Sequence, residues 1–208
     1  MHSNQMIRRA GPCLGLSLLS LLAATPALAH HPFGMPEGSG INAWQGVISG
    51  IGHPLLGPDH LLFLLAIALV GLRQPLRWVL PLLALGLGGS LLSQLVPLPS
   101  ALETAAEACV SLTLVLEGLV ILGRLPVWLL LPAISLHGYL LGGAVIGAEP
   151  APLLAYGLGL LIGQGVLLLA VTGVSSRLLE GVGSNGRQIA AGVWIGIGAA
   201  FTWSLLVP

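Results

Sequence analysis

Long apolar runs separated by short breaks dominate this 208-residue chain from residue 42 onward. The runs cover residues 42–72, 78–96, 105–123, 126–147, 151–174 and 189–207. Each is long enough to cross the roughly 30 Å hydrocarbon core of a bilayer, which takes about 20 helical residues. The sequence therefore predicts an all-α integral membrane protein, a bundle of six transmembrane helices.

The composition supports this class and excludes others. The chain is 55% hydrophobic and only 7% charged, and it contains no lysine. With few charges and no net charge, the chain has no basic patch that could bind nucleic acid. The expected partner is the lipid bilayer. The two cysteines, Cys13 and Cys109, lie far apart in apolar or terminal sequence. Neither a disulfide nor a paired-thiol metal site is expected, and any bound metal needs nitrogen and oxygen ligands.

The first 29 residues have the features of a secretory signal peptide. Arg8 and Arg9 precede the apolar stretch Leu14–Leu22, and Ala27-Leu28-Ala29 forms a small-x-small cleavage site. The mature chain would then begin at His30, with residues 30–208 forming one transmembrane domain. An uncleaved N-terminal helix is the alternative.

Arginines indicate how the helices are oriented, because cytoplasmic loops collect positive charge. If the mature N-terminus lies outside, the inner connections are residues 73–77, 124–125 and 175–188. These connections hold every arginine that follows the signal peptide: Arg73, Arg77, Arg124, Arg177 and Arg187. The predicted outer connections hold none. The sequence therefore predicts a multi-pass protein of a bacterial-type inner membrane with a periplasmic N-terminus.

The first apolar run contains an unusual polar segment, residues 50–60. In an unbroken helix His53 and His60 would share a face but lie about 10.5 Å apart along the axis, too far to share one ion. Pro54, Gly57 and Pro58 lie between them and disfavour a regular helix. We therefore expect the first helix to break at Pro54, Gly57 and Pro58, with Pro58 starting the second half-helix. Irregular backbone at this depth must be buried in protein or line a cavity.

The break would bring three ligand-type side chains together: His53, Asp59 and His60. Ionisable groups in a bilayer cost roughly 2.5–3.5 kcal/mol each and usually mark a pathway or a site. Imidazole nitrogen with carboxylate oxygen suits divalent ions such as Ni²⁺, Co²⁺ and Zn²⁺. The alternative is that these groups only form hydrogen bonds within the bundle, or that Asp59 caps a half-helix.

Other polar residues in the apolar runs are few. In the third run Glu103 and Glu107 lie one turn apart on one helix face near the outer surface, where they could attract cations. Glu117 is expected near the inner surface, close to Arg124. His137 falls in the middle of the fourth run, where it is either a metal contact or a structural histidine.

The segment His53-Pro54-x-x-Gly57-x-Asp59-His60 resembles the signature of the HupE/UreJ family of nickel and cobalt permeases. The resemblance continues in the third run, where Glu107 is followed by the hydroxyl residue Thr113 and by Gly118. It continues again in the fourth run with His137-Gly138-Tyr139-x-x-Gly142. The first motif is specific, and the other two support it.

The resemblance implies uptake of Ni²⁺ or Co²⁺ as the transported substrate, with no prosthetic group and no enzymatic activity. Its metal-handling residues map to His53, Asp59 and His60, with Glu107 and His137 as secondary candidates. His30 and His31 at the mature N-terminus would collect the ion outside.

The chain departs from the family pattern where relatives often have further histidines. It has Leu141 in the fourth run and Leu168 in the fifth. These departures leave the choice between Ni²⁺ and Co²⁺ open, along with the coupling ion. The oligomeric state is also open, with a homo-oligomer as one option.

Three alternatives remain at this stage. A non-transporting accessory protein would present metal to a partner. A membrane haem protein would use His60 and His137 as axial ligands. An intramembrane metal-dependent hydrolase would use Asp59 or Glu107 as a general base, but the chain has no His-Glu-x-x-His or Gly-x-Ser-x-Gly motif.

Overall fold

A computed structural model describes residues 42–143 and 150–207. The predicted signal peptide, together with His30 and His31, lies outside these residues. Within them the chain is all-helical, without strands. The elements in chain order are α2 (Ala43–Leu56), α3 (Pro58–Ala66), η3 (Ile67–Leu69), α4 (Pro75–Leu95), η4 (Ser100–Leu102), α5 (Glu103–Ile121), η5 (Val127–Leu129), α6 (Leu130–Gly143) and α7 (Pro150–Leu206).

Several of these helices are suited to a bilayer. By length and composition, 3 helices could cross a membrane, or up to 4 if the bent pair α2 and α3 counts as one span. The helix Val127–Gly143 is apolar but shorter. Large apolar side chains also cover the outside of the bundle, with Leu80 74% exposed and Leu154 76% exposed. Such a surface is suited to contact with lipid rather than water.

The first predicted run is broken, as expected, but at one point only. Helices α2 and α3 meet at an angle of 70°, and the break is at Gly57, whose φ of −74° and ψ of 111° are extended. Pro58 takes the first position of α3. Pro54 does not break the chain, because α2 continues through it to Leu56. The extended conformation of Gly57 is the one that a following proline favours, so Pro58 accounts for the break.

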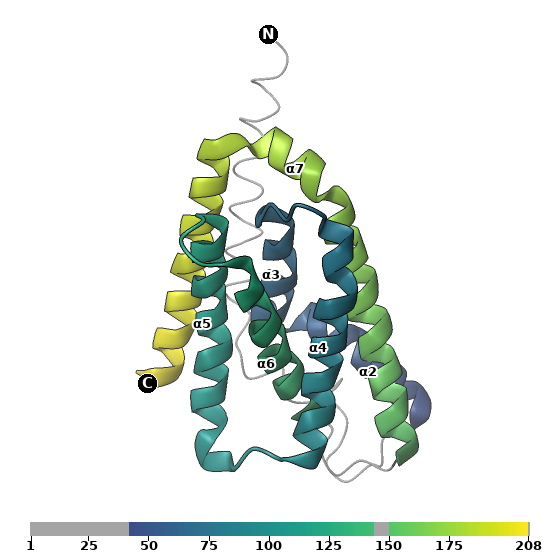
Figure 1. The fold of residues 1–208 in the computed structure, drawn as a ribbon. Helices are drawn as coiled ribbons and strands as arrows, with labels where there is room; N and C mark the ends of the chain where they lie inside the picture. The colour runs from purple at the N-terminus through teal and green to yellow at the C-terminus, as the bar shows by residue number, and fades with distance from the viewer. Residues whose placement is uncertain (1–41, 144–149, 208) are drawn as a thin grey trace.

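The predicted inner connection 175–188 contains the bend between two helical arms, but it is helical rather than a loop. Helix α7 contains 57 residues and has one non-helical residue, Gly183, with φ 65° and ψ −176°. An unbent helix of this length would span about 86 Å, nearly three times the hydrocarbon core. The bend at Gly183 instead gives two arms, seen in light green and yellow (Figure 1). These arms contain the fifth and sixth predicted apolar runs.

The helices approach one another closely at glycines. A Cβ placed on Gly138 of α6 would overlap the backbone of Gly86 of α4, and one placed on Gly159 of α7 would overlap Val47 and Gly50 of α2. Side chains at these positions would force the helix pairs apart. Small residues therefore let α6 and the first arm of α7 hold α4 and α2 at backbone contact.

All described arginines gather at one end of the bundle. The end of α3, the start of α4, the end of α5 and the Gly183 bend lie together at this end (Figure 1). The arginines are in or beside these segments. Arg187 also links them, because its guanidinium donates to the carbonyls of Ile121 (3.1 Å) and Val70 (3.4 Å). We call this the arginine end; the sequence predicted it to be the inner side.

Candidate functional site

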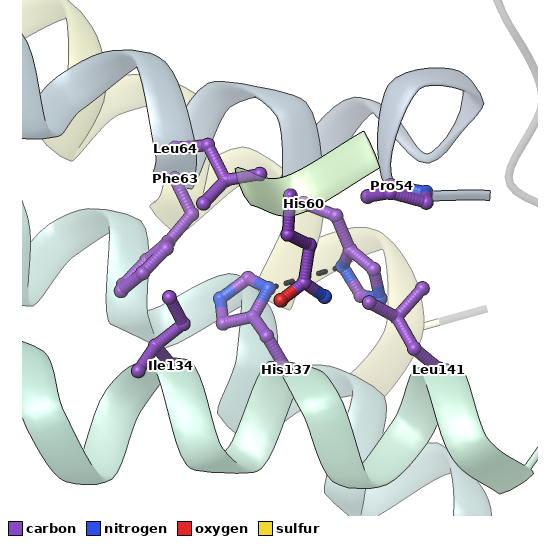
Figure 2. A pocket seen from close by; sticks show the side chains of 8 residues that line it. Pro54, His60, Phe63, Leu64, Ile134, His137 and Leu141 are labelled. Atoms are coloured by element: carbon purple, nitrogen blue, oxygen red, sulfur yellow. Dashed lines mark hydrogen bonds between the residues drawn. The ribbon is translucent and has the colours of Figure 1, made fainter. Parts of the chain in front are cut away.

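The break between α2 and α3 brings three histidines from distant parts of the sequence together. His53 lies in the last turn of α2 and His60 in the first turn of α3, and their ring centroids are 6.5 Å apart. His137 comes from α6, and its ring centroid is 4.7 Å from that of His60. Figure 2 shows the rings of His60 and His137 turned toward each other. His60 and His137 are almost fully buried, at 8% and 3% exposed.

His60 joins the carboxylate to the third histidine. Its Nδ1 lies 3.2 Å from Oδ1 of Asp59 and 3.1 Å from Nδ1 of His137. The same Asp59 oxygen accepts the backbone N–H of His60 at 2.9 Å. Asp59 therefore contacts both the backbone and the ring of His60, but it does not cap α3, whose N-cap residue is Gly57.

A threonine fixes the orientation of His137. The Thr113 hydroxyl of α5 donates to the carbonyl of Val110 at 2.6 Å, and its oxygen lies 2.7 Å from His137 Nε2. In the neutral tautomer with the proton on Nε2, His137 donates to this oxygen and keeps a lone pair on Nδ1. That lone pair faces His60, whose Nδ1 must then hold the shared proton. A hydrogen bond of this kind orients a histidine for metal binding.

A tyrosine plays the same part for His53. Tyr156 of α7 donates its hydroxyl proton to the carbonyl of Leu141 at 2.7 Å. Its oxygen then accepts from His53 Nδ1 at 2.8 Å. Neutral His53 therefore has its lone pair on Nε2. Both histidines that flank His60 are thus held in defined tautomers by hydroxyl groups of neighbouring helices.

The spacing of these ligand atoms can be compared with that in a metal site. Two ligands bound to one ion at about 2.0–2.1 Å lie about 2.9–3.4 Å apart for bond angles of about 90–109°. The two distances from His60 Nδ1, 3.2 Å and 3.1 Å, fall in this range. Even so, no group of three or more His, Cys, Asp or Glu among the described residues is arranged to hold an ion. The imidazoles form hydrogen bonds to each other, and an ion would have to replace the proton between them.

A small cavity lies beside the histidine pair. The space open to the centre of a water molecule is about 10 Å³, enough for one water or one desolvated ion. Most of its lining is apolar, including Phe63 and Leu141, and the polar groups are His60, His137 and Gln164 (Figure 2). Leu141, one of the two departures from the expected family pattern, therefore lines this cavity.

The structure separates the predicted site residues into two groups. His53, Asp59, His60 and His137 meet in one network, whereas Glu107 is half-buried on α5, about 9 Å along the helix from Thr113. Glu103 is exposed. Glu117 lies in the half of α5 nearest the arginine end, the predicted inner side, and is fully buried, at 0% exposed.

Two residues of this region had not been given a role from sequence. Tyr156 and Gln164 both come from the first arm of α7 and are each 2% exposed. The only signal they carried was polarity within an apolar run. Their partners come from other helices, so their roles depend on tertiary packing.

The fold and the site define a helical membrane protein with a buried imidazole–carboxylate network at a broken helix. The chain belongs to the HupE/UreJ family: the family model described as HupE / UreJ protein matches residues 18–201. No curated protein and no solved structure matches the chain.

Proposed function

We propose that this protein is a permease that takes up Ni²⁺ or Co²⁺ across a bacterial-type inner membrane. The observation that supports it is the placement of His60 Nδ1 within 3.2 Å of Asp59 and 3.1 Å of His137, at a helix break. Imidazole and carboxylate ligands suit these ions. Family membership is consistent with such a role.

The ion would reach the network from the end opposite the arginine end. The predicted outer groups His30, His31 and Glu107 would collect it before it reaches His53, Asp59 and His60. Binding requires the proton on His60 Nδ1 to move to Nε2 of the same neutral ring, which leaves a lone pair on each Nδ1 for the metal. Release follows when the helices rearrange or the ligands are protonated.

The wider setting belongs to the same proposal. Six crossings would arise from the broken span, α4, α5, α6 and the two arms of α7, with lipid around the bundle. The mature N-terminus would be periplasmic, following cleavage of residues 1–29. The protein would act without a prosthetic group and without catalysing a reaction, and its oligomeric state stays open.

The haem alternative is disfavoured by the space available. The Nδ1 atoms of His60 and His137 lie 3.1 Å apart and share a hydrogen bond. A macrocycle does not fit between these rings.

Metal accumulation in cells lacking other nickel and cobalt importers tests the proposal. Replacing His53 or Asp59 with alanine is expected to reduce accumulated metal to the level of cells without the protein. Glu180→Gln, at an exposed position of α7, is the control and should retain uptake. Normal accumulation in both alanine variants, at equal protein level, would reject the site.

Uptake should also depend on pH in a defined direction. Histidine binds metal only when neutral, and its ordinary pKa is about 6.5. We expect initial uptake rates to fall as the outside pH is lowered through about 6.5, and to be restored on returning to neutral pH. A rate that stays constant between pH 5 and 8 would contradict histidine ligation.

A non-transporting accessory protein is the second candidate, because it could use the same ligands. Flux into sealed proteoliposomes separates the two. A permease carries ⁶³Ni²⁺ into vesicles that contain only this protein, whereas an accessory protein binds the ion without moving it.

A further inference from the structure

A buried carboxylate in the half of α5 nearest the arginine end takes no part in the network described above. Glu117 is 0% exposed, and neither of its oxygens has a hydrogen-bond partner among the described residues. The contact between Asp59 and His60 is the ion pair found within this part of the chain, and Glu117 is not in it. An ionised carboxylate without partners or water is strongly disfavoured. Its surroundings therefore favour the neutral acid, which carries a proton.

The position of Glu117 along α5 connects two regions already described. Thr113, which bonds His137, lies one turn away on one side, and Ile121, whose carbonyl accepts from Arg187, lies one turn away on the other. Each is about 6 Å from Glu117 along the helix axis. Glu117 thus lies between the histidine network and the arginine end.

Charged groups on the helices packed against α5 do not neutralise it. Helices α3, α6 and α7 all contact α5. Their titratable side chains are Asp59, His60, His137, Tyr139, Tyr156, Arg177, Glu180 and Arg187. None of them lies within hydrogen-bond reach of either Glu117 oxygen. The carboxyl group of Glu117 can therefore be neutralised in this packing only by binding a proton.

We propose that Glu117 is a proton-binding site, separate from the histidine network, and that its proton moves inward together with the transported cation. Proton binding stands on burial alone, while the coupling rests on the proposed function. Because Glu117 shares no hydrogen bond with the imidazoles, both sites can be occupied at once. Simultaneous occupancy favours co-transport over exchange. In each cycle one proton binds the carboxylate from outside and one leaves it inside.

Infrared difference spectroscopy of the purified full-length protein tests the proton itself. The carbonyl stretch of a protonated carboxylic acid is measured at neutral pH in wild type, Glu117→Gln and the control Glu180→Gln, at an exposed position of α7. We expect the band in wild type and in Glu180→Gln, and its loss in Glu117→Gln. Identical spectra in wild type and Glu117→Gln would overturn the proposal, whether or not the protein transports metal.

Steady-state accumulation of ⁶³Ni²⁺ in proteoliposomes tests the coupling. With the membrane potential clamped, a gradient of one pH unit, acid outside, should raise the accumulation ratio about tenfold if one proton accompanies each ion. Glu117→Gln should show no response to the gradient, while Glu180→Gln should respond as wild type does. A retained tenfold response in Glu117→Gln, or an unresponsive wild type, would overturn co-transport. No accumulation by wild type under any condition would instead reject the permease function.

A second variant covers the case in which glutamine at 117 prevents folding. Glu117→Asp keeps the carboxyl group and shortens the side chain by one methylene. We expect it to retain the acid band at a shifted frequency. An unshifted band in a folded Glu117→Asp protein would assign the proton to another residue.

Discussion

The helices of this protein break at two glycines, Gly57 and Gly183, and the two breaks have different causes. Gly57 has an ordinary φ of −74° and is buried, with space for a Cβ at 3.5 Å from Asp59 and His60. Gly183 has φ 65° and ψ −176°, and nothing lies within 4 Å of a Cβ placed there. The first break follows from Pro58, whereas the second needs glycine itself, since few other residues adopt that conformation.

The surroundings of the two breaks differ as much as their causes. Irregular backbone at membrane depth must be buried in protein or face a cavity, and the Gly57 break lies against the histidines and a small cavity. The Gly183 break lies at the arginine end (Figure 1), away from the histidine network. A broken helix therefore indicates a site only when polar side chains from other helices meet it.

The largest effect should come from removing the residue at the centre of the first break. His60→Ala deletes the nitrogen that contacts both Asp59 and His137. We expect nickel affinity in detergent to fall by at least about 100-fold. Removing a metal ligand should lower the affinity more than removing a hydrogen bond that only orients a ligand. Calorimetric titration measures it. Binding within threefold of wild type would place the ion elsewhere.

A smaller loss should follow when the hydroxyl behind His137 is removed. Thr113→Val keeps the side-chain shape but cannot accept the His137 Nε2 proton. Supporting hydrogen bonds of this kind change metal affinity by about 10–100-fold. The same titration should show this loss for Thr113→Val, recovery in Thr113→Ser, and no change in the exposed control Thr104→Val. Equal losses in Thr113→Ser and Thr113→Val would indicate a packing effect.

At the second break, substitution should affect stability but not metal binding. Gly183→Ala places alanine in a backbone conformation that costs about 1–3 kcal/mol for residues other than glycine. The unfolding temperature in detergent should drop, while nickel affinity stays within twofold. Gly173→Ala, at an exposed helical position with open space, should be neutral or stabilising. A stable Gly183→Ala protein would contradict the strained bend.

The smallest effect is expected at Gly57. Alanine fits both its backbone angles and the space around it, so Gly57→Ala should change the unfolding free energy by no more than about 1 kcal/mol, with stabilisation favoured. Nickel affinity should be unchanged. Loss of binding in this variant would show that the glycine has a role of its own in the site.

The sequence predicted the helical class, the break in the first run and the arginine end, because hydropathy, proline and charge act locally. It placed the break at three residues, whereas the structure has it at Gly57, since α2 tolerates Pro54. It also predicted a loop over residues 175–188, where a single glycine bend suffices. The composition of residues 175–188 does not show that the helices on both sides continue up to Gly183.

The site was predicted only in part, for a physical reason. His53, Asp59 and His60 lie within eight residues of one another, so motif and spacing identified them. Thr113, Tyr156 and Gln164 come from other helices and gain their roles through packing across the bundle. The burial of Glu117 is likewise a property of the packed helices.

By itself, the sequence determined that the chain is a helical membrane protein with a proline-broken first helix rich in metal-ligand side chains, since these properties depend on composition and local order. The tertiary structure decided which groups meet. Close packing at glycines brings His137 onto His60, fixes the tautomers through Thr113 and Tyr156, and leaves one carboxylate without a partner. Those outcomes depend on distances between helices that sequence order does not contain.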